Sequence, residues 1–163
     1  MNTIEAIVLG AIQGASERLP ISSEAQTMLY MLNHLKMETQ IALSYAIFLH
    51  IGTMLAVLLR FNGEFRAVLK NLSPGFKLTR ILIFAMLATA ISALPLYFWL
   101  KTTFSEYRGT FINLFIGLML ILTGLIIKAS SKSGGKNLDQ ITDRDIAFVG
   151  FVQGFSILPG ISR

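Results

Sequence analysis

The reactive side chains of this chain are concentrated in two short polar stretches of otherwise apolar sequence. The first stretch contains Gln13, Glu17, Ser22 and Ser23, and the second contains Gln153. Gln13 and Glu17 are four residues apart, so on a helix they share one face. A glutamate can act as a general base or bind a divalent cation, and a serine can donate to a phosphate oxygen or attack phosphorus. These residue types predict a site for a phosphorylated ligand.

The end of the second stretch adds a cation to this set. Ser162 and Arg163 close the sequence, and the guanidinium of an arginine matches two phosphate oxygens at once. An ionisable side chain within an apolar, membrane-inserted segment costs free energy, so such residues are candidates for function. The predicted site residues are Gln13, Glu17, Ser22, Ser23, Gln26, His50, Gln153, Ser162 and Arg163.

The two polar stretches are copies of one motif. Residues 10–16 and 150–156 both read Gly-x-x-Gln-Gly-x-Ser, and each copy is followed by Leu-Pro and then Ile-Ser. An acidic residue precedes each copy, Glu5 in the first and Asp145 in the second. A polar, proline-broken motif that recurs within apolar sequence indicates a binding site at the interface between two repeats.

The composition indicates a membrane protein. The chain is 53% hydrophobic and 14% charged, whereas about 25% of the residues of a soluble domain are charged. Three runs without formal charge have about the 20 residues that cross a roughly 30 Å hydrocarbon core. The runs are residues 41–59, 81–100 and 109–127. We therefore predict an all-α, polytopic membrane fold.

The apolar segments 3–16 and 145–158 are too short to cross a bilayer. We interpret them as re-entrant arms that turn back at a proline, with an amphipathic or poorly inserted helix as the alternative. Three spans separate the arms, so the arms enter from opposite faces and form an inverted repeat. The predicted organisation is a first re-entrant motif in 1–40, three spans in 41–130, a cytoplasmic linker in 131–144 and a second motif from 145 to 163.

Loop charges orient the spans. Five basic residues lie between Arg60 and Arg80 and four between Lys128 and Arg144, whereas only two lie between Lys101 and Arg108. The positive-inside rule places the two richer loops in the cytoplasm. We expect a multi-pass protein of the plasma membrane. The net charge of +5 is therefore assigned to these loops and not to nucleic-acid binding.

The motifs resemble the undecaprenyl-diphosphate phosphatases, the membrane enzymes linked to bacitracin resistance. The resemblance rests on Gln13, Glu17 and Leu-Pro-Ile-Ser-Ser at 19–23, and on Gln153 and Pro-Gly-Ile-Ser-Arg at 159–163; the run 50–57 is also similar. It implies hydrolysis of a polyprenyl diphosphate to the monophosphate plus phosphate, which recycles the lipid carrier for cell-envelope glycans. The bilayer and the polyprenyl diphosphate are then the partners, and a homodimer is left open.

The resemblance also implies roles for the site residues. Glu17, Ser23 and Arg163 take the catalytic roles, and the remaining site residues bind substrate. The substrate-binding set is Gln13, Ser22, Gln26, His50, Gln153 and Ser162. Glu17 is also the candidate ligand of a divalent cation, Mg²⁺ or Ca²⁺, acting as a Lewis acid.

Two features depart from the family pattern. The family commonly has histidine where this chain has Gln26, and glutamine neither titrates nor attacks phosphorus. The reaction then falls to Glu17 and Ser23, or the histidine is dispensable in a subgroup of the family, and the attacking group is left open between serine and water. The family also continues beyond the position of Arg163, so we interpret the chain as a truncated member.

His50 either makes an interhelical hydrogen bond or supports the phosphate site. The alternatives in function are a polyprenyl-phosphate flippase or small-solute transporter, and a non-catalytic membrane fragment.

Overall fold

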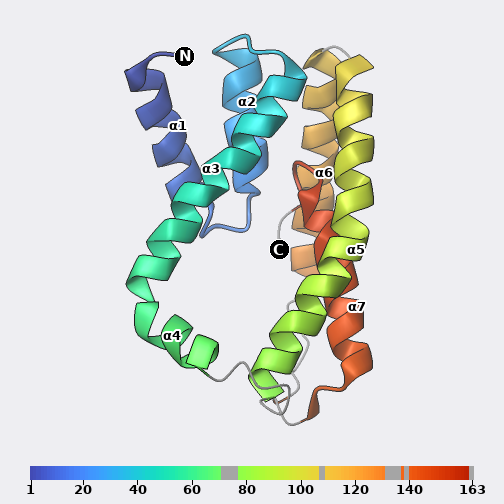
Figure 1. Ribbon diagram of the computed structural model, residues 1–163. Coiled ribbons are helices and arrows are strands. Elements are labelled where there is room, and N and C mark those ends of the chain that lie inside the picture. The colour runs from blue at the N-terminus through green and yellow to red at the C-terminus, as the bar shows by residue number, and fades with distance from the viewer. Residues whose placement is uncertain (71–76, 107–108, 131–136, 138–139, 162–163) are drawn as a thin grey trace.

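The computed structural model describes the chain except residues 71–76, 107–108, 131–136, 138–139 and 162–163. Within the described part every regular element is a helix (Figure 1). Three helices are long and apolar enough to cross a membrane: α3 (Thr39–Arg60), α5 (Lys77–Glu106) and α6 (Gly109–Ser130). The predicted all-α fold with three spanning helices is confirmed. The segment predicted as a linker, 131–144, lies largely outside the described residues.

The spanning helices carry large apolar side chains that no other part of the described chain covers. Phe48 and Leu59 on α3, Met86 on α5 and Leu114 on α6 are each more than 60% exposed. Exposed apolar surface of this extent is typical of a protein that is solvated by lipid.

The remaining helices are shorter. They are α1 (Thr3–Ser16), α2 (Ser23–Asn33), α4 (Asn62–Lys70), α7 (Asp143–Gln153) and the 3₁₀ turn η2 (Gly154–Ile157). Helix α4 lies where the sequence indicated only a basic loop. It went unpredicted because its nine residues are too few for an apolar period, although Phe65, Val68 and Leu69 share one face.

The acidic residue before each motif copy has the same structural role. Glu5 and Asp145 each form a capping box, with Asn2 and Thr142 as the respective N-cap residues. These boxes satisfy backbone N–H groups at the start of α1 and α7. Helix α7 consequently begins at Asp143, two residues before the predicted boundary.

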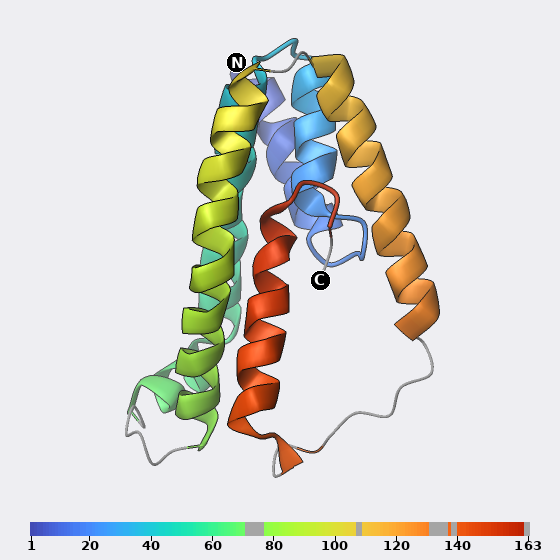
Figure 2. The ribbon, with the colours of Figure 1, turned by 90° about the vertical axis from the view of Figure 1, so that its right-hand side faces the viewer.

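Helices α1 and α7 approach the centre of the molecule from opposite ends. Figure 1 shows α1 running inward from the end where the N-terminus lies, and α7 running inward from the other end. The turned view of Figure 2 shows the same opposition, with the turn after α7 next to the loop between α1 and α2. The two motif copies thus end near the same level of the fold.

Helix α5 extends beyond its apolar run because its last turns pack into the core. The sequence predicted a span ending near residue 100, whereas the helix continues to Glu106. Leu100 and Phe104 are buried in the core cluster, and Phe104 stacks edge-on against Phe115 of α6. Tertiary packing therefore lengthens the helix past the point at which hydropathy indicates an end.

Helix α7 packs closely along α5 through two glycines of the second motif. A Cβ at Gly150 would lie 2.6 Å from the carbonyl oxygen of Ala85, and one at Gly154 would collide with Ser92 Oγ. Thr89 Oγ1 donates to the Gly150 carbonyl at 2.9 Å, and Ser92 Oγ donates to the Phe151 carbonyl at 2.8 Å. The glycines bring the α7 backbone within reach of these hydroxyls.

This packing predicts a different tolerance at equivalent positions of the two motifs. Gly14, the counterpart of Gly154, would place a Cβ in open space. We expect Gly154→Ala to destabilise the protein by about 1–3 kcal/mol, the usual cost of overpacking, and Gly14→Ala to change stability much less. Thermal unfolding of the two purified variants in detergent compares them. Equal losses of stability would contradict the α5–α7 contact.

Candidate head-group site

Glu17 is the centre of the polar cluster. It caps the C-terminus of α1, and its Oε2 accepts hydrogen bonds from Gln13 Nε2 at 2.9 Å and from Ser23 Oγ at 2.6 Å. The four-residue spacing on α1 brings Gln13 to Glu17, and the loop 17–22 turns the chain so that Ser23 meets the same oxygen. A hydroxyl that donates to a carboxylate has the geometry of a nucleophile beside its base.

His50 of α3 supports the same carboxylate. Its Nε2 lies 3.5 Å from Glu17 Oε2, and its Nδ1 lies 2.9 Å from the carbonyl oxygen of Ala46. A carbonyl only accepts, so Nδ1 carries a proton and donates it there. When Nε2 is also protonated, the imidazolium forms an ion pair with Glu17. This contact joins α3 to the end of α1, and the support of a phosphate site by His50 stays a prediction.

Ser22 connects the first motif to the second. Its Oγ caps α2 by accepting from the Ala25 N–H at 3.4 Å, and it also accepts from the Gly160 N–H at 3.1 Å. Ser22 has φ 54°, a conformation that few residues other than glycine adopt. Gly160 has φ 105° and its carbonyl accepts from Thr123 Oγ1 of α6 at 2.8 Å. The two motif ends, 138 positions apart, are thus in direct contact.

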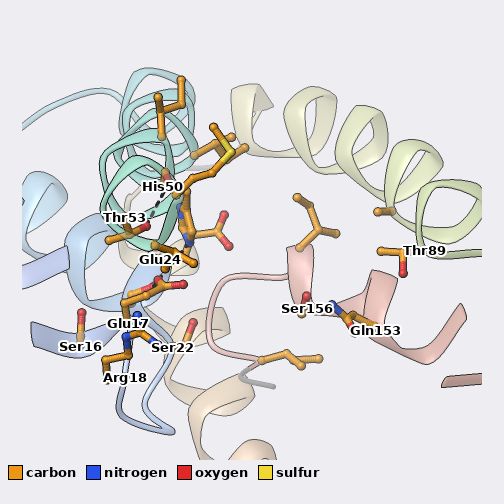
Figure 3. A pocket seen from close by; sticks show the side chains of 18 of the residues that line it. Ser16, Glu17, Arg18, Ser22, Glu24, His50, Thr53, Thr89, Gln153 and Ser156 are labelled. Carbon is orange, nitrogen blue, oxygen red and sulfur yellow. Dashed lines mark hydrogen bonds and ion pairs between the residues drawn. The ribbon is translucent and has the colours of Figure 1, made fainter. Parts of the chain in front are cut away.

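A cavity of about 920 Å³ lies beside this cluster. Figure 3 shows Glu17, Arg18, Ser22 and Glu24 on one side of it and Gln153 and Ser156 on the other, with His50 and Thr53 above. Residues of both motifs therefore face one space. Arg18, within this lining, provides the positive charge among the described residues of the cavity.

Two predicted site residues serve the framework of the site. Gln13 is 1% exposed and is not among the residues that line the cavity. Its side-chain amide donates a hydrogen bond to the Glu17 carboxylate. Gln26 also lies outside the lining, and its Nε2 donates to the Ile21 carbonyl at 3.1 Å, which fixes the loop before α2. Ser162 and Arg163 lie outside the described residues, one and two positions beyond Ile161, which lines the cavity.

The polar residues of the lining that were absent from the predicted set are Ser16, Arg18, Glu24, Thr53, Thr89 and Ser156. Thr53 and Thr89 carry no charge and lie within spanning helices, where nothing in the local sequence distinguishes them from neutral neighbours. Glu24 stands in the first turn of α2, where an acidic residue is common for helix stability alone. Its burial, at 7% exposure, is the signal that only the structure gives.

The described residues do not by themselves fit a divalent cation. No group of three His, Asp or Glu side chains in that part of the chain could hold a metal ion. The Oε2 of Glu17 lies 3.5 Å from His50 Nε2, but it already accepts two hydrogen bonds. Mg²⁺ and Ca²⁺ prefer six or more oxygen ligands, so an ion here would depend on oxygens of a bound phosphate.

The fold and the site define a polytopic membrane protein with a polar cavity between two copies of one motif. The chain matches the family described as Bacitracin resistance protein BacA over residues 6–163, and it belongs to that family. No solved structure matches the chain.

Three similar curated relatives bear the same name. An undecaprenyl-diphosphatase of Methanothrix thermoacetophila is 47% identical over 163 residues, which are all of this chain and 61% of the relative. Those of Methanopyrus kandleri and Pyrobaculum aerophilum are 40% and 35% identical to this chain. Each match covers 97% of this chain, and it covers 60% of the first relative and 61% of the second. The chain thus spans about three fifths of the length of the curated relatives it matches.

Proposed function

We propose that this chain forms the head-group site of a membrane phosphatase that hydrolyses undecaprenyl diphosphate, or a similar polyprenyl diphosphate, to the monophosphate and phosphate. The observation that carries the proposal is the hydrogen bond from Ser23 Oγ to Glu17 Oε2, 2.6 Å long, at the edge of a cavity that both motifs line. The name of the curated relatives supports the substrate. By recycling the lipid carrier, such an enzyme sustains the synthesis of cell-envelope glycans.

The proposed chemistry begins with the transfer of a proton to Glu17. The proton comes from Ser23 Oγ or from a water at the same place, and the oxygen attacks the terminal phosphorus as the bridging P–O bond breaks. If Ser23 attacks, a water then hydrolyses the phosphoserine, which releases phosphate and restores the hydroxyl group. Gln13 and His50 hold Glu17 in position from two sides. Hydrogen-bond donors at the phosphate are then needed to stabilise the charge in the transition state. Arg18, Gln153 and, two positions after Ile161, Arg163 are the proposed donors.

An apolar wall continues from the polar end of the cavity. Ile47, Ile51, Met54 and Val57 of α3 line it, together with Phe65 of α4. Positions 47, 51 and 54 recur at helical spacing, so they form one face of α3. We propose that the first isoprene units of the lipid lie along this face, since burying apolar surface stabilises the bound chain.

This groove predicts that a bulky substitution discriminates between a substrate that carries isoprene units and one that carries none. We expect Met54→Trp to lower kcat/KM for undecaprenyl diphosphate by about 10- to 100-fold, which corresponds to about 1–3 kcal/mol of overpacking. Hydrolysis of inorganic diphosphate, which carries no isoprene unit, should fall much less. Met86→Trp is the matched control, because Met86 lies exposed on α5 and does not line the cavity. Equal losses on both substrates would remove the groove from the proposal.

We also propose that α1 with α2, and α7 with its following turn, are re-entrant arms of an inverted repeat in the plasma membrane. The opposed directions of α1 and α7, the matching capping boxes and the shared motif support this arrangement (Figures 1 and 2). A homodimer is not part of this proposal.

An experiment in detergent distinguishes hydrolysis from transport, because no membrane separates two compartments there. The protein, expressed from its complete reading frame and purified in detergent, is mixed with undecaprenyl diphosphate, and ³¹P NMR follows the products. The proposal requires that monophosphate and phosphate appear in equal amounts. A stable diphosphate signal would favour the flippase or transporter, which the names of the relatives do not favour.

A further inference from the structure

Glu24 carries a second carboxyl group at the cavity. The chemistry proposed above for Glu17 and Ser23 gives this group no role. It lines the same cavity and is 7% exposed. Its Oε1 is buried and has no hydrogen-bond partner in the part of the chain that the structure describes. A buried polar atom without a partner is expensive, so its presence in a residue that also lines a cavity calls for a functional explanation.

Stabilisation of the α2 terminus does not explain Glu24. An acidic residue in the first turn of a helix usually faces water or accepts from free backbone N–H groups. The Ala25 N–H is already satisfied by Ser22 Oγ, and the Gln26 N–H by the Ser22 carbonyl. The side chain of Glu24 is buried instead of meeting water.

The two carboxyl groups have opposite surroundings. Glu17 accepts hydrogen bonds from Gln13 and Ser23. The Glu24 Oε1 receives no such bond among the described residues, and burial raises the pKa of Glu24 to about 8. Environments that differ in this way are how one site holds a base and an acid together. Glu17, Arg18 and His50 are the other titratable groups that line the cavity within the described ranges.

We propose that Glu24 is the general acid of the reaction and a catalytic residue that donates its proton to the leaving group. This assignment rests on the proposed function. As the new bond forms between the attacking oxygen and the terminal phosphorus, the proton of the attacking group passes to Glu17. The bridging P–O bond breaks with its electron pair on the oxygen of the polyprenyl monophosphate, and that oxygen takes the proton of Glu24.

The test compares Glu24→Gln with the wild type in the purified protein, using undecaprenyl diphosphate and a full pH–rate profile. Glutamine keeps the size and a donor N–H but has no transferable proton. We expect kcat to fall by about 100-fold or more, the range for a lost acid–base group, with KM and Tm little changed. The wild type should lose activity as the pH rises through about 8, and the variant should not show this limb.

The outcomes separate this assignment from the proposed function. A wild type that releases no phosphate overturns the proposed function itself. A wild type that is active, together with a Glu24→Gln protein of equal kcat or with an unchanged alkaline limb, overturns only the role of Glu24. If Glu24→Gln does not fold, Glu24→Asp decides, because it keeps the acid but withdraws it by one methylene. It should keep the limb and lose kcat, and full activity would contradict the proposal.

Discussion

Replacing Glu17 by glutamine should lower kcat by about two to four orders of magnitude, the usual range for a general base. The substitution keeps the shape of the side chain, and Gln13 and Ser23 can still approach it. It removes the negative charge that accepts their hydrogen bonds and the capacity to take a proton. Phosphate release from undecaprenyl diphosphate under saturating substrate measures the loss.

Glu38→Gln is the matched control for this prediction. Glu38 precedes α3, is exposed, and makes no side-chain capping bond. Its replacement should leave kcat within about threefold, because exposed charges contribute little. If Glu17→Gln kept near-normal turnover with its thermal unfolding unchanged, Glu17 would be excluded from the reaction.

The two adjacent serines should respond in different ways. Ser23→Ala should lower kcat by about two orders of magnitude or more, because it removes the hydroxyl that Glu17 activates. Ser22→Ala should mainly lower stability, by about 1–3 kcal/mol, because the buried Gly160 N–H and the start of α2 lose their acceptor. Steady-state kinetics and thermal unfolding, measured on both variants, separate the two effects.

Formation of a phosphoserine during turnover decides whether serine or water is the attacking group. If Ser23 attacks, acid quenching during turnover should trap a phosphoserine in the wild type and none in Ser23→Ala. If both alanine variants stay active and no phosphoprotein forms, then water attacks directly with Glu17 as its activator. Loss of activity in Ser22→Ala alone would contradict the distinction drawn from the geometry.

Local regularity explains which parts of the fold could be predicted. The three spanning helices follow from uncharged runs of sufficient length, and the pairing of Gln13 with Glu17 follows from their spacing on α1. The four-residue spacing is a property of any helix, so no tertiary information is needed. The extension of α5 to Glu106 required that information, because packing of Phe104 determines it.

Long-range contacts explain what the sequence could not give for the site. The meeting of Ser22 with Gly160 depends on how α7 packs against α5, and the motif repeat indicates only that the two ends are related. Gln26 had the chemistry of a ligand for phosphate, but the turn before α2 uses its amide to hold the Ile21 carbonyl. The environment of Glu24 differs from that of a usual first-turn acid only through its burial.

The most direct test of this account asks whether the two motifs build one site in the membrane. The 163 residues contain no cysteine, so Ser22→Cys and Ile161→Cys can be introduced as a pair and treated with a short bis-methanethiosulfonate reagent. Because Ser22 contacts Gly160 directly, we predict an intramolecular cross-link that requires both cysteines and forms more slowly when diphosphate is bound. Two cysteines that each react with a single-ended reagent but never cross-link would place the motifs apart and contradict the shared site.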